Sequence, residues 1–155
     1  MAWPAFRTDP VASLRITWWS CALGYAVCLG GVPLAASVVY WLAVELLNDT
    51  GITRTAIGPA LQYAERVVEY LMYSFIAAYM GAALSVPVVI WARLRGWFGW
   101  GTAMLTGVGV AIVVLGLLFQ MDMAKILVEL TLPSALLGLS FWITVRVIHP
   151  QAFVS

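Results

Sequence analysis

Charged side chains stand near the ends of three long apolar stretches of this chain, where carboxylates can pair with cations or conduct protons. The stretch AERVVEYLMY, residues 64–73, places Glu65, Arg66 and Glu69 just before a run that is apolar as far as Ala92. Ionisable groups at the edge of a membrane or inside it usually pair or line a cavity, and some form proton paths. We therefore select a candidate charged cluster drawn from all three stretches: Glu45, Glu65, Arg66, Glu69, Asp122, Lys125 and Glu129.

The sequence lacks the residue combinations of common catalytic and metal sites. His149 is the only histidine, so it can supply at most one haem ligand, and there is no HExxH motif, Ser–His or Cys–His pair. Cys21 and Cys28 are seven residues apart on one expected helix, which separates their α-carbons by about 10 Å, and a disulfide needs less than about 7 Å. We predict a protein that is not an enzyme, with no catalytic residue, cofactor or metal.

The composition is that of a membrane protein. Hydrophobic residues make up 63% of the 155 positions and charged residues 10%, against about 25% charged in an ordinary soluble domain. The net charge of +1 gives no basic surface, so we expect no nucleic-acid partner. Aromatic rings concentrate at segment ends, as they do at membrane interfaces: Trp18, Trp19, Tyr40, Trp41, Trp91, Trp97, Trp100 and Trp142.

Four apolar runs predict an all-α fold of four transmembrane helices in an antiparallel bundle, forming one domain over residues 1–155. A span needs about 20 helical residues. The first run resembles a signal peptide in its arginines and apolar core, but we interpret it as a retained transmembrane helix. The expected helices are 16–47, 61–92, 97–120 and 125–148.

The arginines predict the orientation of these helices. In a four-pass topology one side holds Arg7, Arg15, Arg93, Arg95 and Arg146, and the other side holds most of the acids. The positive-inside rule then places both termini in the cytoplasm. Seven Arg against one Lys, with abundant Ala, Gly and Val, is typical of a GC-rich bacterial gene, so we expect a bacterial inner membrane protein with the lipid bilayer around it.

The first two helices are longer than a membrane is thick. Each has about 31 residues, or about 46 Å, against a hydrocarbon core of about 30 Å. We expect residues 38–47 and 61–70, joined by the turn-rich NDTGITRTAIGP, to project outward as a helical hairpin. In the alternative, Gly30, Gly31 and Pro33 bend the first helix so that 38–47 lies flat in the interface.

Small residues spaced by four predict close helix packing, because lipid gives no hydrophobic drive for helix association. Such series occur in all four helices, and the fourth contains Ser134 and Gly138. Whether these faces pack within the chain or against another subunit is open. Prolines 33, 87 and 133 predict kinks. The candidate packing residues are Ala77, Gly81, Ser85, Ala103, Gly107 and Ala111.

Three functions fit this sequence. The first is a non-catalytic small subunit or accessory protein of a larger membrane complex for transport, secretion or respiration, with other membrane subunits or further copies of the chain as partners. The second is a small ion- or proton-coupled transporter or channel that uses the outer carboxylates. The third is an immunity or regulatory protein that binds a toxin, peptide or lipid on its outer face. The near absence of charge in the middle of the second and third helices argues against the transporter, because a proton relay places a carboxylate near the midplane.

The segment YAERVVEYLMYSFIAAYMGAAL, residues 63–84, resembles the second helix of the small membrane subunit of tripartite ATP-independent periplasmic transporters. That subunit likewise has four helices and an acidic pair at the start of its second one. The Arg–Tyr turn and the basic-His segment of that family are absent here, and the resemblance covers about 22 residues. By analogy it implies the accessory-subunit class.

Overall fold

The chain is helical throughout the residues that the structure describes. The computed structural model describes residues 6–49, 54–76, 78–118, 128 and 130–153, and among these it has no strand. Two helical segments, Trp18–Leu47 and Thr131–Ile148, are long and apolar enough to cross a membrane, and Trp100–Gly116 is a shorter apolar helix. The all-helical prediction is therefore confirmed, and two segments have the length and composition of membrane spans.

The first long helix is continuous but changes its winding in the middle. It comprises α2 (Trp18–Ala26), a π-helical segment η1 (Val27–Gly31) and α3 (Val32–Asp49). Thr17 caps its start by accepting a hydrogen bond from the Ser20 amide at 3.3 Å. Buried Pro33 follows the π segment directly, and its missing N–H and its ring disturb the regular helical bonding of the preceding turn.

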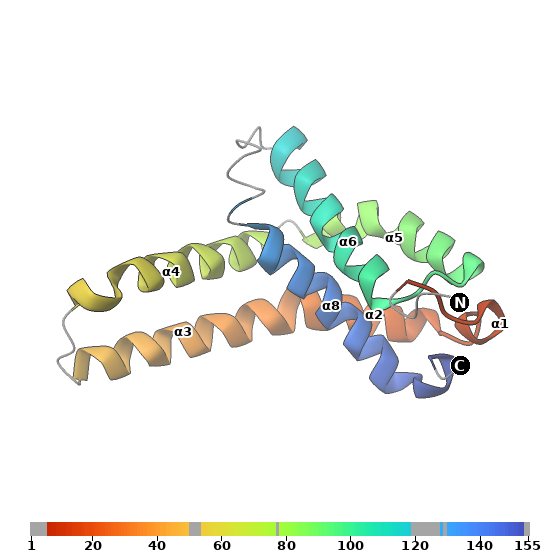
Figure 1. The fold of residues 1–155 in the computed structure, drawn as a ribbon, viewed down its shortest axis with the longest axis horizontal. Helices are drawn as coiled ribbons and strands as arrows, with labels where there is room; N and C mark the ends of the chain where they lie inside the picture. Colours follow the sequence, from red (N-terminus) through yellow and green to blue (C-terminus); the bar gives the residue numbers. More distant parts are fainter. Residues whose placement is uncertain (1–5, 50–53, 77, 119–127, 129, 154–155) are drawn as a thin grey trace.

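The second apolar run contains α4 (Arg54–Ile76) and α5 (Ala78–Arg95), on either side of residue 77, which lies outside the described residues. Helix α4 begins earlier than the expected residue 61, so part of the predicted turn is helical, and Pro59 lies in the second turn, where it removes a single backbone hydrogen bond. Helices α3 and α4 pack side by side as a hairpin that extends to the left in Figure 1. The structure thus contains the helical hairpin that the sequence predicts for these two segments.

The turn after α5 is a helix C-cap built on glycine. Gly96 has φ of 67°, a left-handed conformation that strains other residues, and the Trp97 amide donates to the Ala92 carbonyl at 2.8 Å. Gly99 then caps α6 (Trp100–Ala111), which continues as the π-helical η2 (Ile112–Leu118). The third helix therefore starts three residues later than expected.

The last long helix, α8 (Thr131–Ile148), packs mainly on α6 and also on α2. Pro133 lies in the first turn of α8, a position that proline tolerates. A short 3-10 helix, η4 (Pro150–Ala152), follows. Val128 and Leu130, just before α8, are π-helical, and the expected start of this helix at residue 125 lies outside the described residues, which omit 119–127 and 129.

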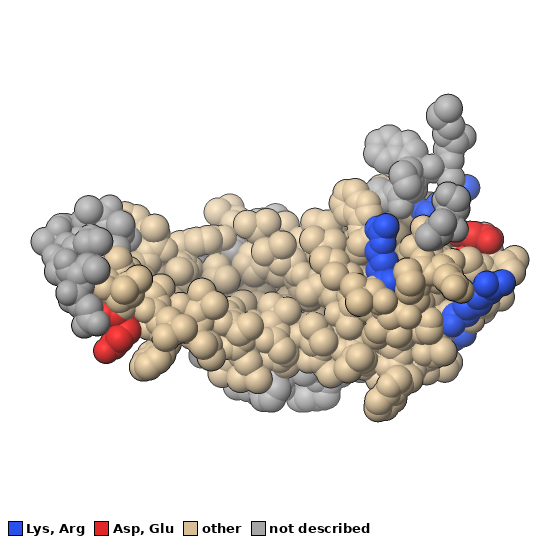
Figure 2. Space-filling view, turned by 90° about the horizontal axis from the view of Figure 1, so that it is seen from below, with Lys and Arg blue, Asp and Glu red and all other residues tan. Residues whose placement is uncertain are grey.

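The two described ends of the chain lie at the same end of the molecule (Figure 1). There the short helix α1 (Pro10–Ser13) docks on α5: the Ser13 hydroxyl donates to the Arg93 carbonyl at 2.7 Å, and Arg93 Nη2 donates to the Leu14 carbonyl at 2.8 Å. Three arginines stack on tryptophans, with Arg7 over Trp97, Arg93 over Trp18 and Arg146 over Trp142. On the face in Figure 2, basic side chains gather at this end together with an acidic group, and a long stretch free of charged side chains separates them from an acidic group at the other end.

Candidate functional site

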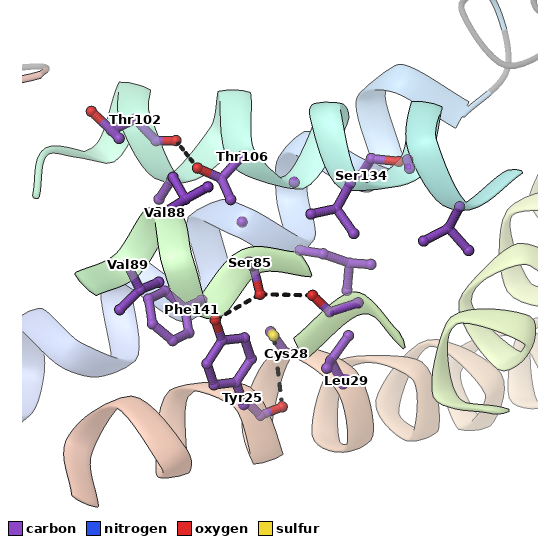
Figure 3. Close-up of a pocket in the computed structure, with 18 of the residues that line it drawn as sticks. Tyr25, Cys28, Leu29, Ser85, Val88, Val89, Thr102, Thr106, Ser134 and Phe141 are labelled. Atoms are coloured by element: carbon purple, nitrogen blue, oxygen red, sulfur yellow. Dashed lines mark hydrogen bonds between the residues drawn. The ribbon is translucent and has the colours of Figure 1, made fainter. Parts of the chain in front are cut away.

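A cavity of about 690 Å³ runs between the helices. One wall is formed by Tyr25, Cys28 and Leu29 of the first long helix, and the others by α5, α6 and α8 (Figure 3). Helix α4 closes one end through Arg66, Glu69 and Tyr70. The segment between α5 and α6, with Trp97 and Phe98, closes the other.

The hydroxyl groups in the cavity wall are held by their own helices or by each other. Ser85 Oγ lies 2.7 Å from the Tyr25 hydroxyl and donates to the Gly81 carbonyl, also at 2.7 Å. Thr106 Oγ1 donates to the Thr102 carbonyl at 2.8 Å. Since a hydroxyl has one proton and it is already used in these bonds, the middle of the cavity presents a largely apolar surface.

Aromatic rings form the end of the cavity near the chain termini. Phe141 of α8 stacks with Tyr25 at a centroid distance of 4.8 Å and with Phe98 at 6.2 Å. Trp142 anchors the same region, because its indole Nε1–H donates to the Phe98 carbonyl at 3.0 Å. This end is therefore both rigidly held and apolar.

The opposite end carries the charged groups of the cavity. Arg66 and Glu69, one turn apart on α4, are the charged residues among those that line it. Next to them the Tyr70 hydroxyl lies 2.6 Å from Ser134 Oγ, which donates to the Leu130 carbonyl at 2.6 Å. The cavity thus changes from apolar to charged along its length.

Most of the predicted packing residues lie in this wall. Gly81, Ser85, Ala103, Gly107 and Ala111 all line the cavity, whereas Ala77 lies outside the described residues. Gly107 and Gly138 also make the closest contact of α6 with α8, because a Cβ at Gly107 would meet the Ser134 carbonyl oxygen and one at Gly138 would meet the Ala103 carbonyl oxygen.

Among the described members of the predicted charged cluster, Arg66 and Glu69 line the cavity. Glu45 is exposed on α3 and Glu65 is exposed on α4, and neither is among the residues that line the cavity. Arg66 and Glu69 lie together at its charged end. Three further members fall outside the described residues: Asp122, Lys125 and Glu129.

The sequence analysis did not select Tyr25, Tyr70, Ser134 or Phe141 as site residues. A signal for the first three existed, because a hydroxyl within a long apolar helix needs a partner on its own or a neighbouring helix. Sequence spacing alone does not say which serine faces which tyrosine.

The cavity lining is dominated by apolar side chains. None of its lining residues is histidine, and within the described residues no three His, Cys, Asp or Glu side chains form a group that could hold a metal. The His149 ring lies at the chain-terminus end, where its Nε2 is 3.3 Å from Thr17 Oγ1. Comparison of this chain with protein-family models, with curated proteins and with solved structures gives no match.

Proposed function

We propose that this chain is a four-pass bacterial inner membrane protein with cytoplasmic termini, and that it acts as a non-catalytic subunit of a larger membrane complex. The positions of the arginines support the orientation. Arg7, Arg93 and Arg146 stack on tryptophans at the end of the molecule where the described chain begins and ends, as interfacial anchors do. Arg15 and Arg95 are exposed, and the four-pass topology expects them on the same, cytoplasmic side.

The observation that carries the subunit role is the length and exposure of the first helix. Trp18–Leu47 has 30 residues, which is about 45 Å of helix against a hydrocarbon core of about 30 Å. Only 11% of its most apolar window is buried within the chain. Its outer part would therefore extend beyond the lipid, where α3 packs on α4.

That outer part presents large apolar side chains on one face. Val38, Trp41, Leu42 and Leu46 recur at helical spacing on α3, and each is more than half exposed. Lipid covers such side chains inside the bilayer, but beyond it an apolar stripe of this kind marks a protein interface. The partner that fits is another membrane subunit whose extramembrane part lies against the α3 stripe.

Photo-crosslinking tests this interface. A photoreactive amino acid at Trp41, 62% exposed, is expected to form a covalent adduct with a second protein in intact cells. The same amino acid at Val147, 74% exposed near the opposite end of the topology, is the matched control and should not give that adduct. An adduct of two copies of this chain would identify the complex as a homo-oligomer, and the absence of any protein adduct at position 41 would refute the subunit role.

Cysteine labelling tests the orientation separately. A membrane-impermeant maleimide should label Glu45→Cys in intact cells and Arg95→Cys only after the membrane is opened. The native Cys21 and Cys28 are 3% and 5% exposed and give little background. Labelling of position 95 from outside would overturn the proposed topology.

A further inference from the structure

The interhelical cavity is large, apolar and partly open to the surroundings of the helices. Its volume of about 690 Å³ is several times that of an apolar protein cavity of about 150 Å³ that stays dry and binds benzene. It falls within the range of about 300–1,000 Å³ found for small-molecule sites. Hydroxyls already bonded within the wall offer little to a chain of water molecules. A hydrocarbon ligand suits this interior.

The cavity is elongated along the helices. It is lined by α6 from Thr102 and by the following η2 as far as Leu115, thirteen residues further, which is about 20 Å of helical rise. One leaflet of a bilayer has a hydrocarbon depth of about 15 Å, half of the core. The cavity is therefore long enough for one lipid chain that lies parallel to the helices.

The charged end has the groups that a lipid head would meet. Arg66 presents a guanidinium, which binds phosphate well, and Glu69 presents a carboxylate one turn away on α4. A phosphate alone would be repelled by Glu69, whereas a head with both a phosphate and an ammonium matches the pair. The opposite end, with Phe98 and Phe141, presents only rings and aliphatic groups to the tail.

We propose that this cavity binds one hydrocarbon chain of a zwitterionic phospholipid, with the phosphate at Arg66 and the ammonium at Glu69. The inference rests on the membrane location in the proposed function, and it adds a ligand that the subunit role does not require. The bound chain would fill the space that α5 leaves between itself and α6.

A pair of glycine substitutions separates cavity filling from other effects. A Cβ at Gly81 would meet Val110 Cγ1 at 3.7 Å, an ordinary contact, so Gly81→Leu fits the backbone and places its remaining atoms in the cavity. A Cβ at Gly109 would have nothing within 4 Å, and Gly109 does not line the cavity, so Gly109→Leu is the matched control. Val110→Phe fills the same space from α6 and is a second test if Gly81→Leu does not fold.

Native mass spectrometry after release from nanodiscs containing equal phosphatidylethanolamine and phosphatidylglycerol measures retained lipid. We expect one phosphatidylethanolamine per wild-type or Gly109→Leu chain, and at least tenfold less on folded Gly81→Leu or Val110→Phe. Glu69→Gln should reduce the preference for phosphatidylethanolamine over phosphatidylglycerol at least threefold, because only phosphatidylethanolamine has the ammonium that Glu69 would bind. Equal retention by the cavity variants and wild type, or a protein chain retained in place of lipid, would overturn the site. Preferential retention of phosphatidylglycerol by the wild type would overturn the assignment of the head group.

The two proposals fail in different measurements. If the lipid site is wrong but the subunit role is right, Gly81→Leu and wild type retain the same lipid while position 41 still crosslinks to its partner. If the subunit role is wrong, the crosslink is absent while the lipid result is unchanged. Loss of membrane insertion in the labelling experiment would overturn both.

Discussion

Replacing Gly138 by alanine should loosen the contact of α8 with α6. An added Cβ would lie 2.7 Å from the Ala103 carbonyl carbon and 3.1 Å from Met104 Cα, besides meeting the Ala103 carbonyl oxygen. All three atoms belong to the backbone, so no side chain can rotate away and the two helices must move apart. Overpacking of this kind costs about 1–3 kcal/mol, and the backbone contacts place Gly138→Ala near the upper limit.

Part of this destabilisation is offset by the helix itself. Alanine is favoured over glycine inside a helix by about 1 kcal/mol, so the expected net loss is about 2 kcal/mol of unfolding free energy. For a chain of this size that corresponds to a decrease in Tm of about 4–8 °C. Gly109→Ala, whose Cβ would have nothing within 4 Å, has the same helix preference without the clash and should leave Tm unchanged or raise it by up to about 4 °C.

The native thiols provide the assay. Cys21 and Cys28 are free and buried, so a thiol-reactive dye reports on unfolding as the detergent-solubilised protein is heated. The comparison between the two alanine variants removes the effects of detergent and of alanine's helix preference. If Gly138→Ala and Gly109→Ala melt at the same temperature, the close contact of α6 with α8 is not present in solution.

Two hydrogen-bond predictions can be checked with the same dye assay. Trp142→Phe should lower the free energy of unfolding by about 1–3 kcal/mol, because it leaves the Phe98 carbonyl without its indole donor at 3.0 Å. Trp19→Phe, at an exposed position, is the control. An equally small loss in both variants would contradict this role of Trp142. Tyr70→Phe removes the hydroxyl that lies 2.6 Å from Ser134 Oγ. The free energy of unfolding should decrease by about 0.6 kcal/mol and by no more than about 1.7 kcal/mol, the range for polar contacts between membrane helices. A larger decrease would mean that Tyr70 supports more than this contact.

Composition and hydropathy were sufficient to predict helices, because a content of 63% hydrophobic residues is typical of membrane proteins, whose backbone groups bond within helices. Some helix ends were also predictable. The turn around ARLRGW follows from Gly96, which alone accepts the left-handed conformation found there. The start of α4 at Arg54 was missed, because Gly58 and Pro59 read as a turn although a helix accepts both near its beginning.

The cavity was not predictable from the residues that line it. Its polar contacts join residues far apart in sequence, such as Tyr25 with Ser85 and Tyr70 with Ser134. Their meeting depends on the tilt and rotation of each helix, which periodicity does not determine. The π-helical segments η1 and η2 add local changes of phase that no simple spacing rule anticipates.

The small residues illustrate why a spacing motif does not have one structural meaning. Gly107 and Gly138 let the backbones of α6 and α8 touch, so adding one carbon to either must displace a helix. Gly81 belongs to the same kind of series, yet a carbon added there would make only an ordinary contact with Val110. The lack of a side chain at Gly81 therefore leaves space between α5 and α6 instead of bringing their backbones together. The same glycine spacing therefore gives a close helix–helix contact where a neighbouring helix fills the groove, and it lines a cavity where no helix does.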